Sequence, residues 1–210
     1  MSDTRYPSMI IMGVQGSGKS TIGAALAQRL NIDFIDGDDL HPKANKDKMA
    51  GGTPLTDEDR GPWLDRVSRA IMNELDDGNR SVVACSALRR AYRDRLRAGV
   101  GRPIYFVHLV GDKSLLTDRL AHRDHEYMPS TLLDSQMETL EPLAEWEHGI
   151  AISVEQSPEA IVDEVTRILM ARAAGRAIEP DAGTTLTGTI DIPRGGSTTA
   201  GTHAGGAQPA

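Results

Sequence analysis

Apolar and polar residues follow two alternating patterns along the chain. Apolar runs of four to six residues are typical of buried strands, and they alternate with longer segments in which apolar residues recur every three or four positions. The runs predict strands at Ser8–Met12, 32–35, 81–85, 104–109 and 150–154. The longer segments predict helices at 19–30, 57–77, 87–97, 112–122 and 132–140, and a closing helix from 158. This order predicts a three-layer α/β sandwich with a parallel sheet of about five strands.

The alternating pattern ends near residue 175. Of the 35 residues from Arg176 onward, 20 are Gly, Thr or Ala, and none is Phe, Tyr or Trp. Such a segment buries too little apolar surface to offset the entropy that ordering costs. We therefore expect one folded domain over residues 1–175 and a disordered tail over 176–210. Docking of Leu186, Ile190 and Ile192 as a short strand is the alternative.

A glycine-rich loop joins the first predicted strand to the first predicted helix. Its sequence, Gly13-Val14-Gln15-Gly16-Ser17-Gly18-Lys19-Ser20, matches the phosphate-loop pattern G-x-x-x-x-G-K-[ST]. Glycine lets backbone N–H groups approach phosphate oxygens, and a helix N-terminus favours their negative charge. We predict that residues 13–20 and Thr21 bind a nucleoside triphosphate, with Lys19 on the outer phosphates and the Ser20 hydroxyl on Mg²⁺. The alternative is a turn that only joins strand to helix.

Composition and charge narrow the expected partners. The 23 Lys and Arg residues against 30 Asp and Glu give a net charge of −7, which lacks the positive surplus of nucleic-acid binders. Cys85 is the single cysteine, so no intramolecular disulfide can form. No apolar run is long enough to span a membrane, and no secretory signal pattern is visible. We expect a cytoplasmic protein with a small-molecule partner and no nucleic-acid or membrane partner.

The surroundings of the phosphate loop separate the classes of nucleotide-binding protein. The guanine-binding motif Asn-Lys-x-Asp is absent, since Asn45-Lys46-Asp47-Lys48 ends in the wrong residue. The third predicted strand ends in Cys85-Ser86, where many nucleotide hydrolases carry an aspartate that binds magnesium. Both observations argue against a GTPase or a motor-type ATPase.

Two carboxylates lie at the end of the second predicted strand. Asp36 and Asp38 are two positions apart, so they point the same way if the strand continues through Gly37. We predict that Asp36 binds Mg²⁺ through water and that Asp38 faces an acceptor hydroxyl, whose proton it accepts or which it only orients. A solvated acidic turn is the alternative.

Four motifs carry a specific resemblance. They are Asp36-Gly37-Asp38-Asp39-Leu40-His41-Pro42-x-Ala44-Asn45-x-x-Lys48-Met49, Gly52-x-Pro54-Leu55-Thr56-Asp57-x-Asp59-Arg60-x-Pro62-Trp63-Leu64, Cys85-Ser86-Ala87-Leu88-Arg89-Arg90-x-Tyr92-Arg93-Asp94-x-Leu96-Arg97 and Met128-Pro129-x-x-Leu132-Leu133-x-Ser135-Gln136-x-x-x-Leu140-Glu141. Over about residues 8–172 the chain resembles the gluconokinase family of phosphate-loop kinases. The resemblance implies a core like that of nucleoside-monophosphate kinases with a mobile lid, often as a homodimer. It also implies ATP-dependent phosphorylation of D-gluconate at its terminal hydroxyl to 6-phosphogluconate, which feeds the pentose phosphate pathway.

Gluconate is a polyol with one carboxylate, so its site needs cations for the acid and polar groups for the hydroxyls. Candidate substrate-binding residues are Asp38, His41, Lys48, Arg60, Ser86, Arg89 and Arg93. Arginine suits the carboxylate because its planar fork offers two donors. Arg60 and Arg89 rank above Arg93, which lies farther along its helix and has a solvated helix face as its alternative. His41 has a plain loop position as its alternative.

Residues 119–140 form the expected helical lid. Arg119 and Arg123 are four positions apart and share a helix face. We expect both to bind the triphosphate and Arg123 to stabilise charge on the transferring phosphoryl group, whereas a surface pair bound to Asp118 or Glu126 is the alternative. The stretch 123–128 departs from the family's Arg-x-Gly-His-Phe-Met by carrying His125 and Glu126, so no role of the family's histidine is transferred.

Two other functions stay open at this point. One is a kinase for another small hydroxy acid such as shikimate, and the other is a module that binds ATP without an acceptor. The residues that contact adenine are not identified by a motif, and the loop around Gln156 and Ser157 is the candidate because it follows the last predicted strand.

Overall fold

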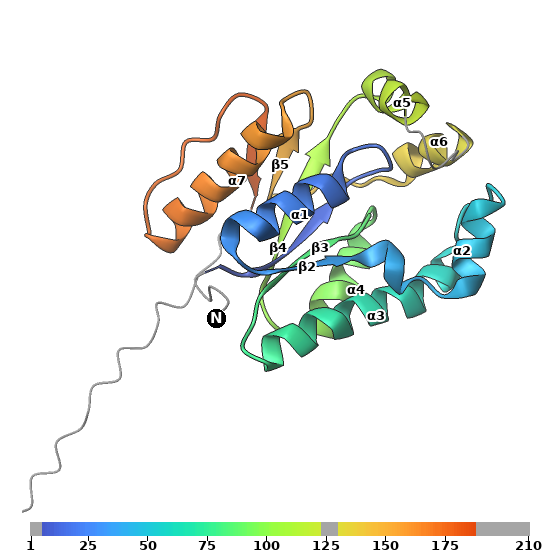
Figure 1. Ribbon diagram of the computed structural model, residues 1–210, viewed down its shortest axis with the longest axis horizontal. Coiled ribbons are helices and arrows are strands. Elements are labelled where there is room, and N and C mark those ends of the chain that lie inside the picture. The colour runs from blue at the N-terminus through green and yellow to red at the C-terminus, as the bar shows by residue number, and fades with distance from the viewer. Residues whose placement is uncertain (1–5, 123–129, 188–210) are drawn as a thin grey trace, which may run out of the picture.

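A six-stranded sheet forms the centre of the molecule (Figure 1). The computed structural model describes residues 6–122 and 130–187. The strand order is β2-β3-β1-β4-β5-β6, with β1 at Ser8–Met12, β2 at Asp33–Asp36, β3 at Ser81–Ala84, β4 at Ile104–Val110, β5 at Gly149–Ser153 and β6 at Thr184–Thr187. Strands β1 to β5 are parallel, and β6 runs antiparallel to β5. The predicted α/β fold is confirmed, with one strand more than expected.

Helices cover both faces of this sheet. They are α1 at Lys19–Leu30, α2 at Lys43–Ala50, α3 at Asp57–Asp76, α4 at Arg90–Val100, α5 at Lys113–Ala121, α6 at Ser130–Thr139 and α7 at Pro158–Ala173. Helices α1 and α7 lie on one face, and α3 and α4 lie on the other (Figure 1). Met9 and Ile11 of β1 pack in the first core and Ile10 and Met12 pack in the second. A continuous apolar strand therefore supplies both cores, because successive side chains point to opposite faces.

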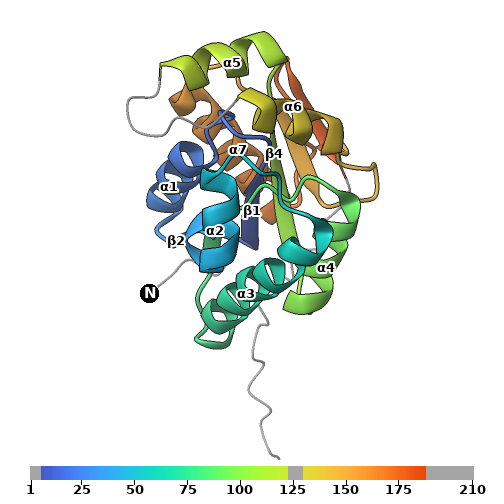
Figure 2. The same cartoon turned by 90° about the vertical axis from the view of Figure 1, so that its right-hand side faces the viewer.

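The carboxyl ends of the parallel strands meet at one end of the molecule. Helices α2, α5 and α6 gather at this end, beside the loop that joins β1 to α1 (Figures 1 and 2). In open parallel sheets, ligands bind in the crevice at this edge. The architecture therefore brings the loops after β1, β2 and β3 together at the expected ligand site.

Two local elements differ from the predicted ones. Residues Gly37–Leu40 form a 3₁₀ helix, η1, and Asp36 caps it by accepting a hydrogen bond from the Asp38 N–H at 3.0 Å. The expected extended path from Asp36 to Asp38 is therefore wrong. Helix α4 begins three residues later than predicted, at Arg90, because Ala87 adopts a φ of 43°, outside the helical region.

The segment after α7 is ordered through Thr187, so the predicted disorder is wrong for residues 176–187. Glu164, a buried residue of α7, accepts hydrogen bonds from the Asp181 N–H at 3.0 Å and from Arg167 at 2.7 and 2.9 Å. Ile178 and Leu186 pack against the first core, and β6 pairs along β5. The apolar side chains at 178 and 186 thus offset the ordering entropy. The rest of the predicted tail, with Ile190 and Ile192, lies outside the described residues.

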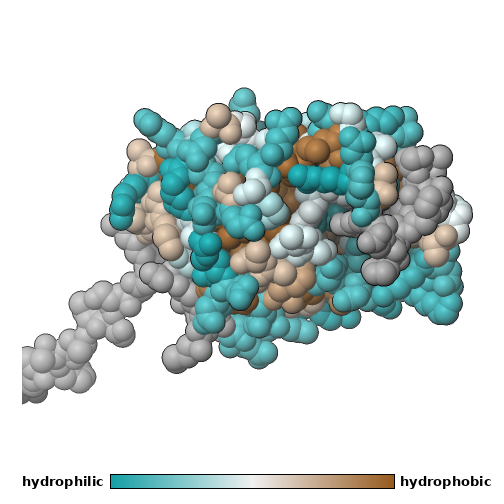
Figure 3. All heavy atoms as spheres, turned by 45° about the horizontal axis from the view of Figure 1, so that its top comes forward, coloured by the Kyte–Doolittle hydropathy of each residue, from teal (hydrophilic) through white to brown (hydrophobic). Residues whose placement is uncertain are grey.

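No described helix is both long and apolar enough to cross a bilayer. The face shown in Figure 3 is mainly hydrophilic, with small hydrophobic patches between polar side chains. Isolated patches of this kind are ordinary on a protein surface.

Arg93 of α4 is a structural residue, so the prediction that it binds the substrate is wrong. Its side chain is 0% exposed, and its guanidinium donates to both carboxylate oxygens of Glu147 at 2.8 and 2.7 Å. It also donates to four backbone carbonyls, those of Ala87, Leu88, Glu141 and Pro142. The guanidinium therefore has no donor left for a ligand, and it ties the start of α4 to the segment 141–147.

Glu147 is equally buried and carries the balancing charge. Burial alone raises its pKa, but hydrogen bonds from Arg93, the Ala144 N–H and Arg97 outweigh this and bring the pKa to about 2. A carboxylate whose pKa is lower in the folded chain than in the unfolded chain stabilises the fold at pH values above its unfolded pKa. This stabilisation is lost as the pH falls towards the folded pKa. The contribution of Glu147 is thus present above about pH 4.5 and is lost towards pH 2.

Replacement of Arg93 by methionine should lower the free energy of unfolding by about 3–5 kcal/mol, because it removes the fully buried partner of the Glu147 charge and leaves only Arg97 beside it among the described residues. Urea unfolding followed by circular dichroism measures this change. Arg95→Met is the matched control on the same helix, since Arg95 pairs with Asp65 at 2.7 Å in an exposed position and should cost less than about 1 kcal/mol. Equal losses in the two variants would contradict this account of Arg93.

Candidate active site

The phosphate loop leaves β1 and enters α1 as the motif requires. Gly13 has a φ of 143°, and a Cβ atom there would lie 2.8 Å from the Leu109 carbonyl oxygen, so only glycine fits. No described side chain caps the first turn of α1, which begins at Lys19. The N–H groups of that turn therefore face the loop without a side-chain acceptor, as in helix N-termini that bind phosphate.

A hydroxyl and a carboxylate meet beside this loop. The Ser20 hydroxyl donates to Asp36 Oδ2 at 2.8 Å, and the Lys19 ammonium donates to the Val14 carbonyl oxygen at 3.1 Å. Hard oxygen ligands of this kind suit Mg²⁺, which takes one or two protein groups and completes its shell with phosphate and water. Among the described residues no cluster of three or more His, Cys, Asp or Glu side chains is placed to hold a metal. The donor set of Ser20 and Asp36 thus fits a magnesium ion that arrives with a nucleotide.

The acceptor cavity, as we call it, opens between the phosphate loop, η1, α3 and α6. Its polar lining residues are Gln15, Lys19, Asp38, His41, Arg60, Ser86, Ser135 and Gln136. Six of the predicted site residues other than the loop's glycines therefore line one cavity, namely Gln15, Lys19, Asp38, His41, Arg60 and Ser86. Asp36 turns to Ser20 while Asp38 lines the cavity, because the 3₁₀ turn at Gly37 separates the two side chains.

His41 forms part of the cavity wall as a neutral side chain. Its ring stacks on Trp63, with centroids 4.1 Å apart, and its Nε2 lies 3.8 Å from Asp38 Oδ1. Burial, followed by the charges of Lys46 and Arg60, lowers the pKa of His41 to about 4. At neutral pH the imidazole therefore has one donor and one acceptor nitrogen, which suits a hydroxyl better than an anion.

Trp63 supports the same wall, although it was not among the site residues predicted from the sequence. The residue is 1% exposed, and its indole N–H donates to the Gly37 carbonyl oxygen at 2.7 Å. This bond fixes the 3₁₀ turn that carries Asp38. The tryptophan in the motif around residue 63 was the available signal for such a role, because a buried indole N–H needs a hydrogen-bond acceptor.

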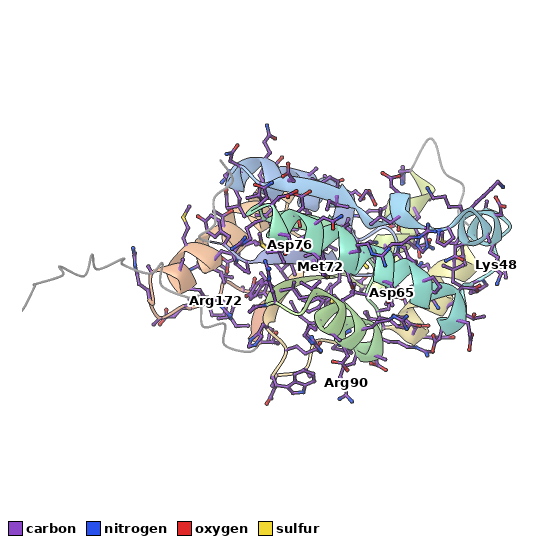
Figure 4. All side chains as sticks on the ribbon, turned by 90° about the horizontal axis from the view of Figure 1, so that it is seen from below. Lys48, Asp65, Met72, Asp76, Arg90 and Arg172 are labelled. Atoms are coloured by element: carbon purple, nitrogen blue, oxygen red, sulfur yellow. The ribbon has the colours of Figure 1, made fainter. Side chains whose placement is uncertain are left out.

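The predicted cations differ in their access to the cavity. Arg60 lines it and is held by the Leu55 carbonyl oxygen, with its guanidinium carbon 5.5 Å from the centre of the Tyr92 ring. Arg89 does not line the cavity and pairs with Asp57 at 2.8 Å. Lys48 does not line it either and pairs with Asp59 at 2.7 Å, on α2 at the edge of the molecule (Figure 4). Among the cationic side chains predicted to bind the substrate, Arg60 is the one that lines the acceptor cavity in the described structure.

A second cavity lies on the other side of the phosphate loop. Its lining residues are Gly16, Ser17, Gly18, Thr21, Ile22, Arg119, Gln156, Pro158 and Ile161. Arg119 donates to the Val154 carbonyl oxygen at 2.6 Å, which holds α5 against the end of β5. The buried Gln156 Nε2 has no hydrogen-bond partner among the described residues. This cavity therefore brings Thr21 and Arg119 together, while Arg123 lies outside the described residues.

Two glutamines and a serine were missed as candidates for the acceptor cavity. Ser135 and Gln136 of α6 line it, and Gln136 Oε1 accepts a hydrogen bond from the Gln15 N–H at 2.7 Å. That backbone N–H is therefore already paired, although residue 15 was predicted to bind the nucleotide. The quoted Ser135-Gln136 motif was the available signal, because two polar residues interrupt an otherwise amphipathic helix.

Comparisons with known proteins give the family of the chain. A family model described as an AAA domain matches residues 9–143. A probable gluconokinase from Xenopus tropicalis is 44% identical over 171 residues, which cover 75% of this chain and 90% of the relative. The gluconokinase of Gluconobacter oxydans (strain 621H) is 43% identical over 159 residues, which cover 76% of this chain and 89% of the relative.

The chain belongs to the gluconokinase family. A crystal structure of a gluconokinase from Sinorhizobium meliloti 1021 matches with a TM-score of 0.73 and 42% identity, over 80% of this chain and 94% of that one. The predicted resemblance and the predicted phosphate-loop fold are thereby confirmed. Like its gluconokinase relatives, the protein is a kinase that uses an alcohol group as acceptor.

Replacement of His41 by glutamine should make the protein less sensitive to acid. A buried histidine with a lowered pKa costs stability as the pH falls from about 6.5 towards 4, since the unfolded chain takes up the proton first. Between pH 7.5 and 5.0 this cost is of the order of 2 kcal/mol for His41. The loss of unfolding free energy over this range, measured with urea, should be smaller in His41→Gln than in the wild type. His122→Gln, at an exposed position, is the control. An equal loss of unfolding free energy between pH 7.5 and 5.0 in His41→Gln and in this control would contradict the account of His41.

Proposed function

We propose that this gluconokinase-family chain transfers the γ-phosphoryl group of ATP to the terminal 6-hydroxyl of D-gluconate, giving 6-phospho-D-gluconate and ADP. The supporting observation is that the acceptor cavity contains Lys19 of the phosphate loop, the Asp38 carboxylate and the Arg60 guanidinium together. A side chain that binds phosphate, one that accepts a proton and one that binds a carboxylate thus line the same cavity. The proposal places the reaction in the cytoplasm, where the product feeds the pentose phosphate pathway.

The phosphate loop and the second cavity hold the donor in this proposal. Backbone N–H groups of residues 13–20 bind the phosphates at the N-terminus of α1, and Lys19 bridges the outer ones. Thr21 and Arg119 line the cavity on that side, and Gln156 is placed to hydrogen-bond adenine or ribose there. Ser20 and Asp36 would hold Mg²⁺, Asp36 through water, and the ion when bound would neutralise negative charge on the phosphates of the nucleotide.

In this proposal, residues of the acceptor cavity bind gluconate and take up the proton of its reacting hydroxyl. Asp38 accepts the proton of the 6-hydroxyl, whose oxygen forms a bond to the γ-phosphorus as the bond to the β-phosphate oxygen breaks and ADP leaves. Neutral His41 and Ser86 bind hydroxyl groups, and Arg60 binds the carboxylate. Helix α6 covers this cavity through Leu132, Ser135 and Gln136, which limits access of water as a competing acceptor.

Loss of Lys19 or Asp38 should abolish gluconate-dependent ADP release. We expect kcat to fall by about 100-fold or more in Lys19→Ala and in Asp38→Asn, because each removes a group that acts on the transferring phosphoryl group or the nucleophile. A coupled assay for ADP with gluconate, shikimate and ribose as separate acceptors measures the effect. Asp39→Asn is the matched control, since Asp39 is exposed and does not line the acceptor cavity.

The same assay separates the alternatives. Turnover with shikimate but not with gluconate would replace the proposed acceptor. ATP binding with no turnover on any of the three acceptors would support a module without catalysis. Gluconate turnover no higher than the ATP-only background would overturn the proposal.

Gln156→Met should weaken the binding of ATP and leave the binding of gluconate unaffected. Gln156 lines the second cavity and its buried amide nitrogen has no described partner, so its replacement removes a hydrogen bond that we expect to form with the nucleotide. We expect KM for ATP to rise about 5-fold, with KM for gluconate within about 2-fold of the wild type. Steady-state kinetics with each substrate varied in turn measures both values. An unchanged KM for ATP would remove Gln156 from the donor site.

A further inference from the structure

The side chain of Gln15 is buried in the acceptor cavity without a partner. Gln15 is 9% exposed, and both its amide nitrogen and its amide oxygen lack a hydrogen-bond partner among the described residues. It lines the acceptor cavity and not the second one. A buried amide without partners costs about 1–3 kcal/mol for each unsatisfied group. An amide in such a position is explained if a bound ligand supplies the missing hydrogen bonds.

The backbone of the same residue is firmly positioned. Gln136 of α6 accepts the Gln15 N–H at 2.7 Å, although the two residues are 121 positions apart. Gln136 lines the cavity too, so α6 and the phosphate loop are joined at the cavity wall. With its backbone fixed in this way, Gln15 presents its amide to the cavity from a defined point beside Lys19 and Asp38.

We propose that the Gln15 amide binds the acceptor hydroxyl next to the one that is phosphorylated, and thereby selects polyol acceptors. A primary amide has donors and an acceptor, which match the donor and acceptor of a hydroxyl group. The phosphate loop marks the reacting end of the acceptor, so the hydroxyl nearest to Gln15 is the neighbour of the reacting one. This inference rests on the proposed function and adds a specificity residue to it.

A site that hydrogen-bonds a hydroxyl rejects analogues that lack it, because its own polar groups then stay unpaired. Wild-type enzyme should therefore use gluconate better than 5-deoxygluconate, by about 10-fold or more in kcat/KM. Gln15→Met keeps the size of the side chain and removes its hydrogen bonds. In this variant KM for gluconate should rise about 10-fold, KM for ATP should stay within about 2-fold, and discrimination against 5-deoxygluconate should fall to less than about 2-fold.

Thermal unfolding gives a second readout that does not depend on turnover. Without ligands, Gln15→Met should unfold at the same temperature as the wild type or a higher one, because the unpaired amide is gone. Saturating gluconate should raise the unfolding temperature of the wild type more than that of the variant. Gln28→Met, on the exposed face of α1, is the control for the substitution itself.

The outcomes separate this inference from the proposed function. If wild-type enzyme gives no gluconate-dependent turnover, the proposed function fails and the role of Gln15 fails with it. If the wild type is active and Gln15→Met keeps its KM for gluconate and its discrimination, only the role of Gln15 is overturned. A rise in KM for ATP alone, or a lowered unfolding temperature without loss of discrimination, also overturns it.

Discussion

Close packing of backbone at the carboxyl edge of the sheet is the constraint on which the site depends. The Gly13 N–H donates to the Ser86 carbonyl oxygen at 3.3 Å, and a side chain at Gly13 would collide with the end of β4. A Cβ atom at Gly37 would overlap the Ala84 carbonyl oxygen at the end of β3. These contacts hold the loops after β1, β2 and β3 against one another. The phosphate loop, the two aspartates and Ser86 therefore meet because backbone, and not side chains, sets their separation.

Electrostatic pairing decides which cations are available for a ligand. The chain is acidic overall, and two of the arginines predicted to bind the substrate have carboxylate partners, Asp57 for Arg89 and Glu147 for Arg93. Arg60 is held by a backbone carbonyl and by an aromatic ring, so its charge is oriented without being neutralised. That difference in partners separates the arginine that lines the acceptor cavity from the structural one more clearly than distance along a helix does.

Sequence patterns predicted the parts of this protein that depend on local spacing. The apolar runs located five strands within one or two residues, and the loop motif located the nucleotide side, since both depend on neighbours in the chain. The burial of Arg93 was out of reach because its partner lies 54 positions away. The turn at Gly37–Leu40 was missed because Asp36 caps it with its own side chain, which competes with the strand. Strand β6, which contains Leu186 from the alternative short strand, was ranked below disorder because its pairing with β5 and the packing of Leu186 depend on residues far away in the chain.

The direction of β6 has a practical consequence for handling the protein. Because β6 runs antiparallel to β5, Thr184 pairs opposite Ile152 and Thr187 pairs opposite Gly149, at the amino end of β5. The described chain thus finishes at the end of the sheet opposite to the one where the phosphate loop opens. A tag, surface anchor or fused domain attached directly after Thr187 starts about the length of a strand away from the phosphate loop. Immobilisation of a chain that ends at Thr187 therefore places the attachment point at the end of the sheet opposite to the phosphate loop.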